Sequence, residues 1–327
     1  MSGTASSSAL RSTPGPMEVA GRRAPGPAIV VLGDLALDIT ASVREPLDPG
    51  SDATASIRFH QGGSAANTAC MVARLGGAAS FVGAVGRDAW GRALVRALRG
   101  AGVAVHAPRV AGTTARIVVM VASDGERTFA TERGAADGLL AAHLRAGWFR
   151  RDGLHLPGYS LFSVPLRDAA LAACGFARAA GAVVSVDLAS RRPLLARGRR
   201  DAVRDLRTVA PDLLFANTDE AAALSGGRRR EALLEVAPVV ALKQGRSGCV
   251  VLARKGLDSV ELVVATRSVE AADTTGAGDA FDAGFLLSWL AAPREARHDP
   301  RVLRAAALAG HRAARRHLAG HRPELES

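Results

Sequence analysis

The segment of the chain best suited to chemistry is DTTGAGDAFDAG at residues 273–284. Small residues at 276–278 stand where a helix is expected to begin, so unpaired N–H groups and the helix dipole converge on one point that attracts an anion. A carboxylate beside that point, Asp279, repels phosphate in the ground state. It suits a group that takes a proton from an alcohol attacking the phosphorus. On the local pattern alone, a purely structural role for Asp279 at the helix N-terminus is an equal alternative.

Two further features could hold a polar ligand. In QGGSAAN, residues 61–67, the diglycine lets the chain pass close to a ligand, and Asn67 offers the donors and the acceptor that vicinal hydroxyls need. A tight strand-to-helix turn, with Asn67 near the cap, is the alternative. Asp38 follows the first expected strand, and the carboxyl edge of a parallel sheet is where ligands bind. Capping or solvation is the usual explanation of a lone aspartate.

Short apolar runs and helical segments alternate along the chain and must position these residues. The runs predict strands at 28–33, 80–86, 154–158, 182–187, 213–217, 239–243 and 249–253. The periodicity predicts helices at 64–75, 88–99, 165–180, 219–224, 275–291 and 301–317. Such alternation predicts an α/β fold with a mostly parallel sheet that is covered on both faces.

Two segments break this rhythm and favour antiparallel strands, at 55–59 and 116–131. In the second, Asp124-Gly125 is a strong hairpin signal between apolar runs. A small sheet added to an α/β core commonly serves as a lid or a dimer surface, and a simple surface hairpin is the equal alternative.

Composition excludes several classes of protein. The chain has 327 residues, of which 48% are hydrophobic and 22% charged, so it can bury a core and is not disordered throughout. No apolar run approaches the roughly 18 residues of a membrane span. Three distant cysteines argue against a disulfide framework or a cysteine zinc site and favour the cytoplasm. Residues 1–27, rich in Ser, Ala, Gly and Pro, predict a disordered tail without a secretory signal.

The net charge of +11 suggests nucleic acid at first sight. However, lysine occurs only at Lys243 and Lys255, and the many arginines are scattered mostly as pairs. Aromatic residues make up only 4%, which leaves few platforms for stacking bases. We therefore expect neither a nucleic-acid partner nor a membrane partner.

The segments GGSAANTACMVARLG and DTTGAGDAFDAGF resemble the two signature sequences of the ribokinase-like (PfkB) family of sugar and nucleoside kinases. The resemblance covers about residues 28–320. It implies a three-layer α/β/α core with a mostly parallel sheet, plus a small β-sheet lid built from parts of 40–60 and 113–133. Residues 321–327 would form a C-terminal tail. In many relatives two lids clasp each other, so the resemblance also implies a homodimer.

The resemblance implies roles at the acceptor end of the site. Asp279 matches the catalytic base that deprotonates the acceptor hydroxyl. The backbone of Gly276, Ala277 and Gly278 matches the anion hole that stabilises the transferring phosphoryl group. The positions that match those holding the sugar hydroxyls are Asp38, Gly62, Gly63 and Asn67.

It also implies the nucleotide end of the site. Asn217 and Glu220 match an N-x-x-E motif, in which Glu220 organises Mg²⁺ through water beside ATP. Lys243, Gly245 and Gly248 resemble the strand–turn–strand next to the nucleotide. Two residues, Asp273 and Thr275, lie where many relatives bind an activating monovalent cation such as K⁺.

The resemblance therefore predicts an ATP-dependent kinase that phosphorylates a hydroxymethyl group of a small carbohydrate. Ala189 replaces an asparagine of the family's D-x-N-x-R pattern, and His155 lies in a region where ribokinases carry a sugar-binding glutamate, so ribose is in doubt as the acceptor. Nucleosides such as adenosine or pseudouridine, sugar acids and sugar phosphates stay open as acceptors. A nucleoside would need an aromatic wall, for which the candidates are Phe59, Phe129 and Tyr159. A non-catalytic sugar-binding regulator is the remote alternative.

Overall fold

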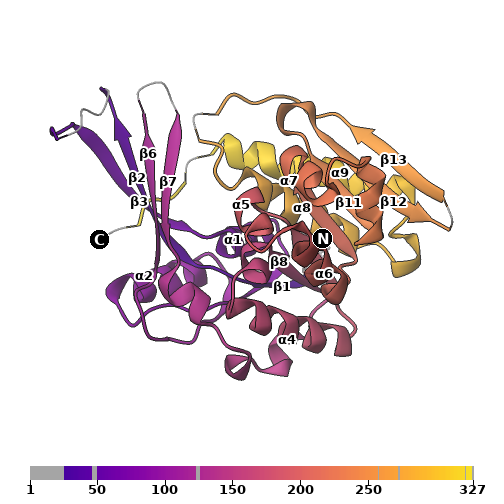
Figure 1. The fold of residues 1–327 in the computed structure, drawn as a ribbon, viewed down its shortest axis with the longest axis horizontal. Coiled ribbons are helices and arrows are strands. Elements are labelled where there is room, and N and C mark those ends of the chain that lie inside the picture. The colour runs from indigo at the N-terminus through magenta and orange to yellow at the C-terminus, as the bar shows by residue number, and fades with distance from the viewer. Residues whose placement is uncertain are drawn as a thin grey trace, which may run out of the picture.

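A computed structural model describes residues 26–45, 50–122, 126–256, 258–271, 273–320 and 322–325. In this part of the chain nine strands form a large sheet in the order β13-β12-β11-β10-β9-β8-β1-β4-β5 (Figure 1). The strands from β11 to β5 pair in parallel, and β12 and β13 add antiparallel strands at one edge. The strand bounds are β1 Ala28–Leu32, β4 Ala78–Val82, β5 Ala104–His106, β8 Gly153–Pro157, β9 Val183–Asp187, β10 Leu213–Asn217, β11 Val239–Lys243, β12 Cys249–Lys255 and β13 Asp258–Val264.

Helices cover both faces of this sheet. On one face, Val30 and Leu32 of β1 share a buried core with α3 to α7. On the other, Ile29 and Val31 pack with α1, α2, α8 and α9. The strands read as continuous apolar runs because both of their faces are buried. The helix bounds are α1 Ser64–Arg74, α2 Ala89–Gly100, α3 Tyr159–Phe162, α4 Leu166–Ala179, α5 Arg191–Leu195, α6 Arg199–Val209, α7 Thr218–Ser225, α8 Ala277–Leu290 and α9 Pro300–Leu318.

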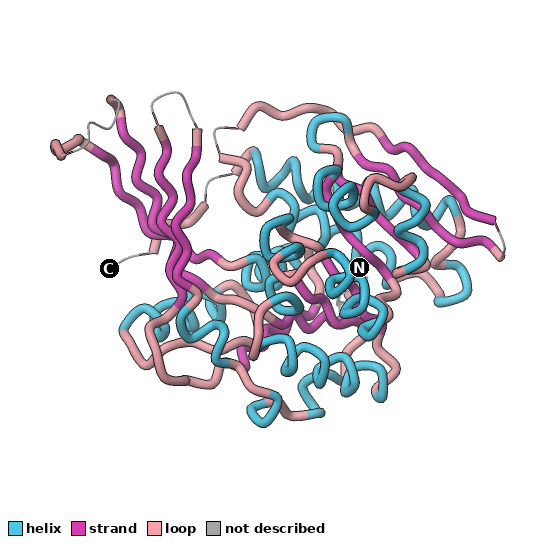
Figure 2. Tube along the Cα trace, viewed as in Figure 1, coloured by secondary structure: helices cyan, strands magenta, loops and turns pink. Residues whose placement is uncertain are grey.

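A second sheet of four described strands, in the order β3-β2-β6-β7, stands away from the core (Figure 2). Its strands are β2 Ala36–Val43, β3 Ala55–Gly62, β6 Ala115–Val121 and β7 Arg127–Glu132. The strands β6 and β7 pair antiparallel, as the expected hairpin requires, whereas its turn at 123–125 lies outside the described residues. We refer to this sheet as the lid.

Residues 322–325 run along the outer edge of β3. The Leu325 amide donates to the Phe59 carbonyl at 2.8 Å, and His60 Nδ1 donates to the Pro323 carbonyl at 3.0 Å. These contacts carry Arg322 to the junction of the lid and the core. The C-terminal segment thus protects a strand edge that would otherwise be open to pairing.

The expected three-layer α/β core with a small lid is confirmed. Asp38, expected just past the first strand, belongs to a strand of the lid. It lies inside β2, opposite His60 of β3 and Ile117 of β6. The Thr and Ser residues after Asp38 dilute the apolar pattern of β2, so this strand has no clear signal of its own. No described helix is long and apolar enough to span a membrane.

Candidate active site

The first turn of α8 presents Asp279 to the junction between the lid and the core. Its Oδ1 accepts a hydrogen bond from Ser64 Oγ at 2.7 Å, and its Oδ2 accepts one from Asn67 Nδ2 at 3.0 Å. Burial raises the pKa of Asp279 to about 6, although these two hydrogen bonds oppose the rise. Both partners come from the first turn of α1, so the GGSAAN segment orients this carboxylate.

The start of α8 also provides backbone N–H groups that can donate to a ligand. Gly276 is the N-cap of α8, and the amides of Gly276 and Gly278 donate to no group in the described part of the chain. The Ala277 amide already donates to the Thr274 carbonyl at 3.2 Å. Two of the three predicted amides are therefore available to an anion beside Asp279.

Asp38 is 4% exposed and faces the diglycine at the end of β3. A Cβ on Gly62 would lie only 2.0 Å from Asp38 Oδ1, so a side chain at 62 would displace the carboxylate. Gly63 has φ 93° and caps α1, a conformation that favours glycine. Asp38 Oδ1 is buried and has no hydrogen-bond partner among the described residues, so it is free to accept from a ligand there.

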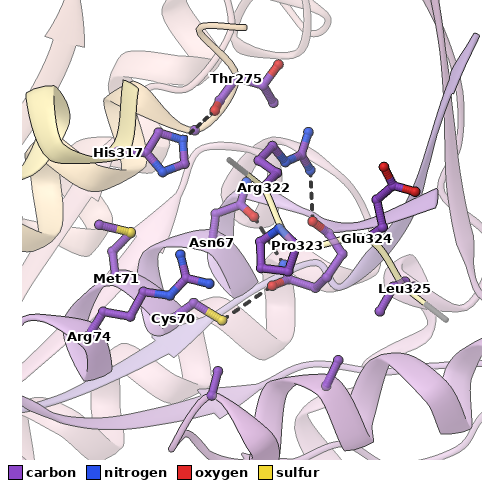
Figure 3. A pocket seen from close by; sticks show the side chains of 14 residues that line it. Asn67, Cys70, Met71, Arg74, Thr275, His317, Arg322, Pro323, Glu324 and Leu325 are labelled. Atoms are coloured by element: carbon purple, nitrogen blue, oxygen red, sulfur yellow. Dashed lines mark hydrogen bonds between the residues drawn. The ribbon is translucent and has the colours of Figure 1, made fainter. Parts of the chain in front are cut away.

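The other oxygen of Asp38 is held by Arg322. Arg322 Nη2 lies 2.6 Å from Asp38 Oδ2 and donates to the Gln61 carbonyl at 2.8 Å. Burial raises the pKa of Asp38, and the Arg322 charge and hydrogen bond oppose that rise. Figure 3 shows Arg322 and Asn67 on the wall of a cavity of about 370 Å³ that continues along α1 to Arg74.

Lys243, at the end of β11, lies beneath the first turn of α8. Its Nζ is 3.0 Å from Asp187 Oδ1 and 3.2 Å from both oxygens of Asp282. Burial alone would lower the pKa of Lys243, but the two carboxylates outweigh it and raise that pKa. Asp282 is fully buried and lies one turn after Asp279 in α8. Its contact with Lys243 therefore anchors the first turn of α8 to the end of β11.

Asn217 and Glu220 form a capping box at the start of α7. Glu220 accepts from the Asn217 backbone and side-chain amides at 2.8 Å each, and Asn217 Oδ1 accepts from the Glu220 amide at 2.9 Å. Burial and the nearby Asp187 charge raise the pKa of Glu220. The N-x-x-E spacing thus has a structural role whether or not a metal binds.

The carboxylates fit a magnesium ion bound through water. No group of three possible metal-binding side chains occurs among the described residues, so a cage made of protein alone is not formed there. Asp187 and Asp282 nevertheless contact the Lys243 ammonium, and the charge of Lys243 also lowers the pKa values of Glu220 and Asp279. Mg²⁺ prefers one or two carboxylates together with waters and phosphates. The donor chemistry therefore suits Mg²⁺ that arrives with a nucleotide.

A separate cavity of about 220 Å³ opens on the other side of Gly278. Its walls contain Lys243, Gly245 and Gly248, which the family resemblance assigns to the nucleotide, together with the first turn of α8 and the last turns of α9. Three arginines also line it, namely Arg246, Arg267 and Arg315. The open amide of Gly278 thus lies between this basic cavity and Asp279.

Asp273 and Thr275 lie together, but protein donors already occupy them. Arg127 of the lid donates to Asp273 Oδ1 at 2.7 Å and to Thr275 Oγ1 at 3.0 Å. The Thr275 carbonyl accepts from His317 Nε2 at 2.7 Å (Figure 3). These oxygens do not fit a bound monovalent cation.

Sequence reasoning brought most of these residues to one place but missed several partners. Ser64 places a hydroxyl at the start of a helix, directly after a diglycine. This local pattern could have predicted a hydrogen-bond donor to Asp279. Arg127 and Arg322 have no comparable local signal. His155 itself is not exposed to a substrate, because its side chain is buried in β8 with Nδ1 2.9 Å from Ser185 Oγ.

The model of the "pfkB family carbohydrate kinase" matches residues 27–323, nearly all of the chain. The chain belongs to the pfkB family. As a pfkB carbohydrate kinase, it is a phosphotransferase that acts on an alcohol group. The pfkB signature segments are those that form the first turns of α1 and α8.

Other pfkB-type kinases are similar to this chain over most of their length. A fructokinase of Klebsiella pneumoniae is 33% identical over 269 residues, which cover 79% of this chain and 83% of the relative. An ATP-dependent ribose-1-phosphate kinase of Halopiger xanaduensis is 35% identical over 251 residues, covering 74% and 78%. A Vibrio cholerae fructokinase, solved with fructose, ADP and potassium, shares the fold with a TM-score of 0.73 at 23% identity, covering 91% and 94%.

Proposed function

We propose that this pfkB kinase transfers the γ-phosphoryl group of ATP to a hydroxymethyl group of a small sugar. The observation that carries the proposal is the position of Asp279 beside the open amides of Gly276 and Gly278, between the lid and the basic cavity. The fructokinases among the relatives support a sugar as acceptor.

In the proposed reaction the acceptor oxygen attacks the γ-phosphorus, its proton passes to Asp279 and ADP leaves. A base works best when its pKa lies near the working pH, and the pKa of about 6 at Asp279 meets that condition. The amides of Gly276 and Gly278 would receive the charge that develops on the phosphoryl oxygens, with Ala277 completing the turn. Asp38, Gly62, Gly63 and Asn67 would hold the other hydroxyls.

ATP would occupy the basic cavity beside Lys243, Gly245 and Gly248. Glu220, oriented by Asn217, would hold Mg²⁺ through water, and the ion would supply neutralising charge on the phosphates. The buried contacts of Lys243 with Asp187 and Asp282 support an indirect role for this residue, which keeps the first turn of α8 in place.

The test is ADP release from Mg-ATP with a panel of hexoses, pentoses, sugar acids, sugar phosphates and nucleosides. We expect turnover above the no-acceptor rate with a free sugar that carries a primary hydroxyl. ADP release at background with every acceptor, from folded protein, would contradict the proposal. Sugar binding by calorimetry without turnover would favour a non-catalytic regulator.

A sugar phosphate or sugar acid is the second candidate acceptor, because Arg133 lies beside Asp34, whose Oδ1 accepts from the Ala65 amide just after the diglycine. The Arg133 guanidinium lies 5.6 Å from the centre of the Tyr159 ring and 3.9 Å from Asp34 Oδ2, and its Nε donates to Asp137 at 2.7 Å. Its Nη2 is buried and has no hydrogen-bond partner among the described residues. An acceptor phosphate would satisfy that donor. The ribose-1-phosphate kinase among the relatives supports the same candidate.

Two of the three aromatic candidates for a nucleoside wall, Phe59 and Phe129, are less suited to that role. Phe59 stacks on Trp90 of α2 at 5.3 Å, and Phe129 is 57% exposed on the lid.

The exposed side chains of Phe129 and of Ile57, which is 59% exposed, support a homodimer through the lid. Sedimentation equilibrium tests the dimer, and Phe129→Ser is expected to weaken it.

Replacing Arg322 with glutamine is expected to raise the acceptor KM about tenfold or more, because a hydrogen bond to a buried charge contributes about 1.5–3 kcal/mol. The KM for ATP should stay unchanged, since Arg322 faces Asp38 and not the nucleotide cavity. Steady-state kinetics with each substrate varied in turn measure both constants.

Glu324→Gln is the matched control, because the described contact of the Glu324 side chain is an exposed ion pair with Arg58 at 3.3 Å. An unchanged acceptor KM in Arg322→Gln, or a lower one, would show that Arg322 does not support acceptor binding.

A further inference from the structure

Asp273 and Thr275 stand immediately before the open amides of α8, where a monovalent cation was expected. Their oxygen atoms are instead bonded to protein donors. Asp273 Oδ1 accepts from Arg127 Nη1 at 2.7 Å and from the Thr275 amide at 2.8 Å, and Thr275 Oγ1 accepts from the same Arg127 nitrogen at 3.0 Å.

Two further oxygens of this segment also face positive or donor groups. Asp273 Oδ2 lies 3.9 Å from Arg322 Nη1, and the Thr275 carbonyl accepts from His317 Nε2. An added cation would have to displace a guanidinium that is already bound to a carboxylate, and that exchange gains little.

The charges of Asp273 and Arg127 also disfavour an added cation at this site. Burial alone would raise the pKa of Asp273, but hydrogen bonds from Arg127 and Thr275 lower it to about 2, so the carboxylate is ionised and paired. The Arg127 side chain is 20% exposed, and it is shielded better than a surface pair would be. Its charge is permanent, and its planar donors reach two oxygens at once.

Arg127 is the first residue of lid strand β7, whereas Asp273 and Thr275 lead directly into Gly276, the N-cap of α8. The contact therefore joins the lid to the loop whose amides would meet the phosphoryl group. A bond between these two parts fixes that loop only when the lid is in place.

We propose that the guanidinium of Arg127 is the resident cation of this site, so that the kinase needs no added K⁺ or Na⁺. Arg127 is a positioning residue that acts through Asp273 and Thr275 on the amides of Gly276 and Gly278. The inference rests on the proposed kinase function, and it adds that the lid itself supplies the charge.

The first test measures kcat with Mg-ATP and the best acceptor in KCl, NaCl or tetramethylammonium chloride, each at about 100 mM to hold screening constant. The wild-type kcat should change less than about twofold among these salts. Arg127→Ala should lose about tenfold or more in tetramethylammonium and should regain activity with K⁺ or with guanidinium. Arg127→Lys, which keeps the charge, should lose less than Arg127→Ala.

Arg204→Ala is the matched control, because Arg204 lies on α6 with a 62% exposed side chain and pairs only with Asp201 of the same helix. Activation of the wild type by K⁺ more than about fivefold over tetramethylammonium would overturn the proposal. So would full activity of Arg127→Ala in tetramethylammonium.

The second test needs no turnover and separates this inference from the proposed function. The melting temperature of the wild type, without substrates, should be the same in all three salts, because the Asp273 and Thr275 oxygens are already bonded to protein donors. Arg127→Ala should melt about 2 °C or more higher in KCl than in tetramethylammonium chloride, because the vacated oxygens then bind the ion. A wild-type melting temperature that rises with K⁺ as steeply as that of the variant would contradict the inference, even for a protein that phosphorylates a sugar.

Discussion

Replacing Asp279 with asparagine is expected to lower kcat about a thousandfold, because the amide cannot take the proton of the attacking hydroxyl. The substitution preserves the surroundings of the side chain. The amide oxygen can still accept from Asn67 Nδ2, and the amide nitrogen can donate to Ser64 Oγ, whose hydroxyl turns round. Substrate binding measured by calorimetry should therefore change much less than kcat.

Ser64→Ala is the matched control for Asp279→Asn. It removes one hydrogen bond that orients the carboxylate but keeps the base, so we expect a loss of about tenfold. If Asp279→Asn kept more than about a tenth of the wild-type kcat, Asp279 would not be the base.

The pH dependence of kcat/KM tests the role of Asp279 as the base independently of the asparagine variant. With the pKa of Asp279 at about 6, kcat/KM in the wild type should fall below pH 6 as the carboxylate takes a proton. Ser64→Ala should move this inflection to higher pH, because the lost hydrogen bond favours the charged form. A profile that is flat between about pH 5 and 8 would contradict the assignment of the base.

The raised pKa also has a consequence for stability. The folded state binds this proton more tightly than the unfolded chain, whose carboxyl titrates near 3.8, so the associated stabilisation is present at low pH and is lost as the pH rises through about 6. At pH 8 the asparagine variant should therefore be at least as stable as the wild type in urea unfolding. A functional carboxylate here lowers stability, as is common at active sites.

Lys243→Met is expected to lower the free energy of unfolding by about 3–5 kcal/mol, because it leaves the carboxylates of Asp187 and Asp282 buried without their shared cation. The methionine fills nearly the same volume, so the loss reflects charge and not a cavity. Urea unfolding followed by circular dichroism measures the change.

Two further variants test whether the loss of stability in Lys243→Met comes from its buried ion pairs. Arg229→Met removes an exposed ion pair, that of a 91% exposed side chain with Glu231, and should change stability by less than about 0.5 kcal/mol. Adding Asp282→Asn to Lys243→Met should recover part of the loss, because one uncompensated charge disappears. Equal stability of Lys243→Met and the wild type would mean that the buried ion pairs do not hold the first turn of α8.

The sequence predicted well what depends on local pattern. The apolar runs predicted the core strands, and the N-x-x-E spacing contained the capping box of Asn217 and Glu220. The glycines of the two signature segments marked the starts of α1 and α8. Each of these signals lies within a few residues of the feature that it predicts.

Contacts between distant segments could not be read in this way. Arg127 is 146 residues from Asp273, and Arg322 is 284 residues from Asp38. In a chain with so many arginines, nothing local distinguishes these two from the others. The strand that contains Asp38 was not predicted, because β2 pairs with β3 and β6, and that pairing is a property of the lid and not of the eight residues of the strand.

The contact between Asp38 and Arg322 joins two ends of the fold, and this bears on how the protein matures during synthesis. The first strands and α1 leave the ribosome long before residue 322. Asp38 therefore has no Arg322 guanidinium to pair with while the rest of the core forms. A chain that has emerged only as far as α9 contains the residues of the cavity beside Lys243, whereas the partner of Asp38 is still missing. The newborn kinase should therefore complete the proposed acceptor site as the last step of folding.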